Sequence, residues 1–128
     1  MTVEIRTARY FDYAKVKESG LVPVATSVGM PKFPMPYEIG AQAGPLAPYG
    51  LLKVEDRDEF TSLYVARLEG FGVDAIEALL GSVAAAYEQP GVVLLCFENL
   101  EKDDGAWCHR AIFAEWWQEK TGQEVTEL

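Results

Sequence analysis

The alternation of hydrophobic and polar residues predicts four strands along the chain. Loose alternation over residues 3–10 indicates a first strand. Two apolar runs, 21–28 and 92–97, have the length of strands that are buried on both faces, and the first is rich in β-branched residues. A last, short strand is predicted over residues 124–128. Strands buried on both faces are typical of parallel sheets, so the pattern indicates an α/β fold.

Helical spacing of apolar residues predicts helices between these strands. The predicted ranges are 11–18, 58–68, 73–88 and 108–120. Alternating strands and helices indicate helices packed on the faces of a parallel sheet. We therefore predict a single compact, three-layer-like α/β domain over residues 1–128, with a small, mostly parallel sheet of about four strands and flanking helices.

The segment between the second predicted strand and the second predicted helix is dense in proline and glycine. Six of the seven prolines lie between Val22 and Gly50, so regular helix or central strand is not expected there. A connection this long is often a lid or a binding loop. The alternative is that its apolar residues pack as an irregular side of the core. These residues are Phe33, Met35, Tyr37 and Leu46.

Composition and charge favour a soluble domain and weigh against a nucleic-acid-binding or membrane protein. A chain of 128 residues, 49% hydrophobic and 24% charged, is typical of one soluble domain. The formal net charge of −9 weighs against binding along a nucleic-acid backbone, because that affinity comes from Lys and Arg. The start of the chain has no signal-peptide pattern, and no apolar run approaches the about 20 residues of a membrane span. A cytoplasmic location without membrane binding is expected.

The chemically reactive residue types gather in residues 94–117, LLCFENLEKDDGAWCHRAIFAEWW. This stretch holds both cysteines, the single histidine and all three tryptophans. It runs from the end of the predicted central strand to the start of the following helix, which is where parallel α/β sheets bind ligands. We expect five of its residues to lie together. They are Cys96, Glu98, Cys108, His109 and Arg110.

Several kinds of chemistry suit this cluster. Cys108 is a candidate catalytic nucleophile of a hydrolase or transferase, because a helix N-terminus beside His109 and Arg110 lowers a thiol pKa. A metal site built from Cys96, Cys108, His109 and Glu98 is another hypothesis, but the tight ligand spacing of structural zinc sites is absent. We therefore assign no metal and no cofactor. The reducing cytoplasm predicts that both cysteines are free thiols.

Noncovalent binding of a small anionic ligand is the hypothesis that needs the fewest coincidences. His109 and Arg110, with Arg6 or Arg9 from the first strand, would recognise a phosphate- or nucleotide-like group, and Cys96 and Glu98 would lie beside it. In the competing interpretation nothing binds. The cysteines are then small core residues, His109 hydrogen-bonds to the backbone, and Arg110 pairs with a loop carboxylate.

The adjacent tryptophans Trp116 and Trp117 lie on an apolar helix face that is expected to pack in the core. Neighbouring residues on a helix point in different directions, so at least one tryptophan is expected to be partly exposed. The alternative is a protein-binding surface. Together with the acidic charge, it suggests a phage-type protein that binds a basic host partner.

The motifs VVLLCFEN, WCHRAIFAEW and TGQEVTEL resemble the signature of an uncharacterised bacterial and phage family called domain of unknown function 488. TARYFDY, LVPVATSVGMPKF and PLAPYGLL are similar to the N-terminal half of that family, so the resemblance spans nearly the whole chain. It implies a compact α/β fold, adds weight to the cysteine and Cys-His-Arg motifs as a site, and implies no reaction. Many members carry Asp-x-Arg in the second strand, whereas this chain has Ala25-Thr26-Ser27, so a role for that arginine does not transfer.

Overall fold

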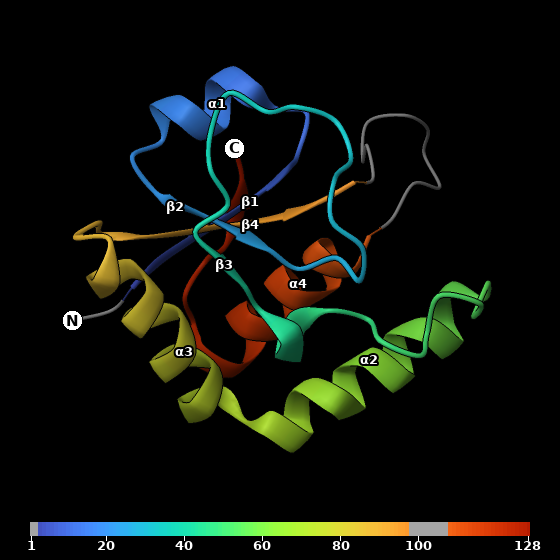
Figure 1. Ribbon diagram of the computed structural model, residues 1–128. Helices are drawn as coiled ribbons and strands as arrows, with labels where there is room; N and C mark the ends of the chain where they lie inside the picture. The colour runs from blue at the N-terminus through green and yellow to red at the C-terminus, as the bar shows by residue number, and fades with distance from the viewer. Residues whose placement is uncertain (1–2, 98–107) are drawn as a thin grey trace.

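The computed structural model, which describes residues 3–97 and 108–128, is built on a parallel five-stranded sheet (Figure 1). The order across the sheet is β3-β2-β4-β1-β5, and every neighbouring pair is parallel. The predicted α/β class is confirmed. The strands are β1 (Glu4–Arg9), β2 (Val22–Ala25), β3 (Ala41–Gln42), β4 (Gly91–Cys96) and β5 (Thr126–Glu127).

Helices cover both faces of this sheet. α1 lies on one face, and α2, α3 and α4 lie on the other (Figure 1). Each predicted helix is present, with boundaries that differ from the predicted ones by up to three residues. No helix in the described part of the chain is long and apolar enough to cross a membrane. The helices are α1 (Tyr13–Glu18), the 3₁₀ helix η1 (Gly44–Leu46), α2 (Arg57–Phe71), α3 (Val73–Ala86) and α4 (His109–Thr121).

Strand β4 is the centre of the fold, and all six of its residues are buried. Its side chains alternate between two core clusters. Val92 and Leu94 belong to the larger cluster with α2, α3 and α4, whereas Val93 and Leu95 belong to the smaller cluster with α1. Because side chains alternate along a strand, Cys96 at the end of β4 points to the α4 side.

The proline-rich segment packs against both core clusters. Phe33, Met35 and Tyr37 are partly buried against the α1-side cluster, and Leu46 in η1 is buried in the other. The Tyr37 hydroxyl donates to the carbonyl of Tyr10 at 2.6 Å, which ties the segment to the end of β1. For these four apolar residues, the expectation that they form an irregular side of the core is confirmed.

Both tryptophans of α4 are buried, so the prediction that at least one is partly exposed is wrong. Trp116 is 4% exposed and Trp117 is 0% exposed. Trp116 Nε1 donates to Glu69 Oε1 on α2 at 2.8 Å, and Trp117 Nε1 donates to Gln123 Oε1 at 2.8 Å. The two rings do point in different directions, but neighbouring parts of the fold cover both sides of the helix.

Candidate functional site

Strand register places the candidate site at the carboxyl edge of the sheet. Arg9 is the register partner of Cys96, and Thr26 follows the last register pair of β2 with β4. The Thr26 amide donates to the Leu95 carbonyl at 3.0 Å, which holds Thr26 beside the end of β4. Cys108 is the residue that caps the N-terminus of α4. The ends of β2 and β4 and the start of α4 therefore meet at one point.

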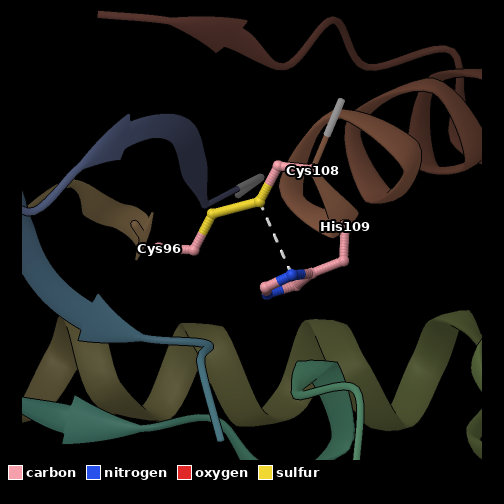
Figure 2. A group of neighbouring side chains, drawn as sticks. All are labelled: Cys96, Cys108 and His109. Carbon is pink, nitrogen blue, oxygen red and sulfur yellow. Dashed lines mark hydrogen bonds between the residues drawn. A yellow bond between two sulfur atoms is a disulfide. The ribbon is translucent and has the colours of Figure 1, made fainter. Parts of the chain in front are cut away.

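The sulfur atoms of Cys96 and Cys108 form a disulfide between the end of β4 and the start of α4 (Figure 2). Their Cα atoms are 7.8 Å apart. Both residues are buried. The prediction of two free thiols is therefore wrong for this structure. The fold brings the end of β4 into contact with the start of α4. The sequence does not show this contact, because eleven residues separate the two cysteines.

The His109 ring is held against the end of β2. Its Nε2 atom is 2.7 Å from the Thr26 carbonyl oxygen and 3.1 Å from Thr26 Oγ1. A carbonyl oxygen can only accept a hydrogen bond, so Nε2 carries the proton and donates it. The neutral ring then has its lone pair on Nδ1, which lies 3.5 Å from Cys108 Sγ (Figure 2). The backbone of Thr26 thus fixes the tautomer that presents an acceptor nitrogen to the sulfur.

His109 is neutral at physiological pH. Burial lowers its pKa from the ordinary 6.5 to about 4, the hydrogen bond with the Thr26 backbone opposes this decrease, and the charge of Arg110 adds to it. A small gap beside the ring, bordered by Tyr64 and Phe113 among others, has no room for a water molecule. The structure confirms the expected hydrogen bond from His109 to the backbone.

The Arg110 guanidinium is buried between two partners. Its Nε and Nη2 atoms donate to Oε1 and Oε2 of Glu127 at 3.0 and 2.7 Å. Its Nη1 atom donates to Cys96 Sγ at 2.8 Å. Glu127 Oε1 also accepts a hydrogen bond from Thr7 Oγ1 at 2.6 Å. Arg110 therefore pairs with a carboxylate of β5, not with the loop carboxylate that sequence reasoning considered.

The other predicted site residues do not join this cluster. Arg6 Nε donates to the Thr126 carbonyl at 3.1 Å, so its side chain lies along β5. Arg9 is level with Cys96 in the sheet, but its Nε atom pairs with Asp12 Oδ1 at 3.1 Å. Glu98, the remaining candidate, lies outside the described residues.

Two residues of the site, Thr26 and Glu127, were not found by sequence reasoning. Thr26 follows an apolar strand directly, which is a weak sign of a position at the sheet edge. Glu127 lies between Thr126 and Leu128 in the last strand, where an acidic residue is ordinarily solvent-exposed. Neither signal identifies the partner, because each contact depends on strand order.

Comparisons of the chain with family models, curated proteins and solved structures gave no match. The resemblance to the domain of unknown function 488 family stays a prediction.

Proposed function

We propose that the protein is a thiol–disulfide oxidoreductase in which Cys96 and Cys108 cycle between a disulfide and a dithiol. One observation carries this proposal: the disulfide joins the end of the central strand to a helix N-terminus and has a buried guanidinium on one sulfur and a neutral imidazole nitrogen on the other. In the cytoplasm, where the sequence leads us to expect the protein, disulfides are usually catalytic or redox-sensing.

Cys108 suits the role of the attacking thiol. It caps α4, a helix of 13 residues, and the partial positive charge of the helix N-terminus favours the thiolate. His109 Nδ1 lies 3.5 Å from the sulfur and carries the lone pair that would accept the thiol proton. Cys108 is thus the group on which the helix and the imidazole act together.

Cys96 suits the role of the resolving thiol and leaving group. Its sulfur accepts a hydrogen bond from Arg110 Nη1 at 2.8 Å. A charged donor at this distance stabilises a thiolate more than a thiol, because the interaction gains from the negative charge. Arg110 is held in place by its paired hydrogen bonds to Glu127.

These roles define a balanced exchange reaction. The Cys108 thiol passes its proton to His109 Nδ1 as its sulfur attacks a substrate disulfide, whose S–S bond breaks and whose first sulfur leaves and takes that proton from His109. The Cys96 thiol then gives up its proton as its sulfur attacks Cys108 in the mixed disulfide. This step releases the second substrate sulfur, which takes that proton. Two electrons and two protons pass from the protein to the substrate, and the Cys96–Cys108 disulfide forms again.

The geometry supports this proposal better than the binding of a free anion. Arg110 is 2% exposed and donates to Glu127 and Cys96, and His109 carries no charge at neutral pH. The two groups that were expected to hold a phosphate therefore already have protein partners. A hydrolase or transferase that uses Cys108 remains the second proposal, and it differs in having no need for Cys96.

Isosteric variants of the two cysteines test the proposal. Reduced protein is mixed with a small aromatic disulfide, and release of the coloured thiol is followed with an external dithiol as reductant. We expect Cys108→Ser to lose all turnover. We expect Cys96→Ser to lose turnover as well and, when the external dithiol is left out, to accumulate a mixed disulfide on Cys108, which intact-mass spectrometry detects.

Each variant is the control for the other, because both make the same chemical change. Turnover retained by Cys108→Ser would overturn the proposal. Hydrolysis of an activated ester that persists in Cys96→Ser, without disulfide turnover by the wild-type protein, would favour the hydrolase instead. Because both sulfurs are buried, we also expect the rate to become independent of substrate concentration once opening of the site is limiting.

A further inference from the structure

We infer that the reduced site binds one zinc ion through Cys96 Sγ, Cys108 Sγ and His109 Nδ1. These three atoms lie within 4.8 Å of one another, and all three residues are buried. The inference rests on the proposed function in one respect, since the disulfide must open before its sulfurs can bind a metal. Thiolate and imidazole are the ligands that Zn²⁺ prefers, whereas Mg²⁺ and Ca²⁺ prefer oxygen.

One edge of a tetrahedral zinc site already has the right length. Zn–S and Zn–N bonds of about 2.3 and 2.05 Å at a tetrahedral angle place the two ligand atoms about 3.6 Å apart. The distance from Cys108 Sγ to His109 Nδ1 is 3.5 Å. The same calculation places two zinc-bound sulfurs about 3.8 Å apart, so Cys96 and Cys108 must separate after reduction.

The main chain leaves room for this separation. Disulfide-linked residues usually have Cα atoms about 4.4–6.8 Å apart. Here the Cα atoms of Cys96 and Cys108 are 7.8 Å apart. Moving the sulfurs apart therefore requires rotation of two side chains and no retreat of β4 from α4.

The groups around the ligands match those of a metal site. Histidines that bind metals usually donate their second ring N–H to a carbonyl or carboxylate, which fixes the ring and its tautomer. His109 Nε2 has this contact with the Thr26 carbonyl at 2.7 Å, so Nδ1 is free to bind. Arg110 Nη1 already donates to Cys96 Sγ, as outer partners of ligating sulfurs do.

Charge accounting also favours a divalent cation. Two metal-binding thiolates would carry −2 in a buried place, and the ion pair of Arg110 with Glu127 is neutral as a whole. Uncompensated buried charge is costly. A zinc ion cancels it, and binding follows the balance dithiol plus Zn²⁺ gives zinc dithiolate plus two protons. The described residues supply three ligands, the number found in catalytic zinc sites that keep a fourth position for water or substrate.

Cobalt binding to the fully reduced protein tests this inference. Co²⁺ is titrated anaerobically into full-length protein held in a non-chelating phosphine reductant, and Zn²⁺ is then added. We expect one Co²⁺ per chain, intense visible bands typical of tetrahedral coordination, and a near-ultraviolet thiolate-to-cobalt band. Zn²⁺ should replace Co²⁺ and remove these bands. When Zn²⁺ is titrated into metal-free reduced protein, each bound ion should release two protons.

Two variants separate ligation from packing. His109→Gln keeps a donor for the Thr26 carbonyl but loses Nδ1. It should therefore bind Zn²⁺ at least about 100-fold more weakly, since loss of an outer partner alone costs 10–100-fold. The matched control is Thr26→Val, which loses the hydroxyl but keeps the carbonyl and should lose less than about 10-fold. His109→Asn is the second ligand variant if His109→Gln lacks the native near-ultraviolet circular dichroism.

The outcomes keep the two proposals apart. Absence of cobalt bands in the reduced wild-type protein would overturn the metal site, as would an unchanged affinity in folded His109 variants or equal binding by oxidised protein. Metal binding without any disulfide turnover would support the metal site and count against the oxidoreductase. Turnover without metal binding would do the reverse.

Discussion

The pH dependence of stability should be dominated, between pH 7 and pH 5, by a single histidine. Burial lowers the pKa of His109 from 6.5 to about 4, so the unfolded chain binds a proton in this window and the folded protein does not. The contribution of the neutral His109 ring to the free energy of unfolding is then present in full above pH 6.5, and it decreases as the pH falls from 6.5 to 4. The loss amounts to about 2 kcal/mol at pH 5 and about 3 kcal/mol below pH 4.

Urea unfolding of oxidised protein, in the presence of a chelator and at half-unit steps from pH 7.5 to 4.5, measures this loss. His109→Gln is the matched control because the chain contains one histidine. Its amide can still donate to the Thr26 carbonyl, and its side chain does not titrate. Carboxylate titration affects both proteins alike, so the difference between the two curves isolates His109.

We expect the wild-type protein to lose about 2 kcal/mol relative to His109→Gln between pH 7 and pH 5. This is a large part of the total stability of about 5–15 kcal/mol that is typical of a small domain. Parallel curves for the two proteins would refute the reasoning. They would mean that the ring gains a proton at its ordinary pKa and that the site opens to water without unfolding.

Two further predictions concern the framework of the site. Glu127→Gln should lower the free energy of unfolding in urea by about 2 kcal/mol, between the values for exposed and buried ion pairs, because the side chain of Arg110 is 1% exposed and that of Glu127 is 36% exposed. The control Glu69→Gln, in an exposed pair, should lower it by less than about 1 kcal/mol, and equal losses in the two variants would contradict this prediction. Gly91→Ala should lower the free energy of unfolding by about 3 kcal/mol, because the added methyl group would collide with the main chain of β1. The control Gly81→Ala, in open space on α3, should raise it by about 1 kcal/mol, and thermal unfolding of both variants measures the difference.

The long apolar runs and the helical spacing of apolar residues in the sequence predict most of the fold. The apolar run at residues 92–97 is β4, and α3 ends at Ala86, two residues before the predicted end at residue 88. Strand β3 was missed because it is two residues long and its pairing with β2 is made by the backbone, which leaves no side-chain pattern. The burial of Trp116 could not be predicted either, since it depends on how α2 lies against α4.

The position of the candidate site in the fold could be predicted from the sequence, but the bonding among its residues could not. A strand end followed by a helix start at Cys108 predicts the meeting of the two cysteines with His109 and Arg110. The disulfide, the tautomer of His109 and the pairing of Arg110 with β5 all depend on strand register and order. Arg9 shows the limit clearly, because it is level with Cys96 in the sheet and yet pairs with a residue of its own connection, Asp12.

The order Cys-His-Arg has a geometric meaning at the start of α4. His109 and Arg110 are successive residues of α4, so their side chains are rotated by about 100° from each other, and Cys108 precedes them in extended backbone. Cys108 reaches the end of β4, His109 reaches Thr26 after β2, and Arg110 reaches Glu127 in β5 while also contacting the sulfur at the end of β4. One helix turn therefore ties three strands of the sheet to the same pair of sulfurs. Moving the helix start by one residue would misdirect all three side chains together, so the motif acts as a unit and its members are best tested in combination.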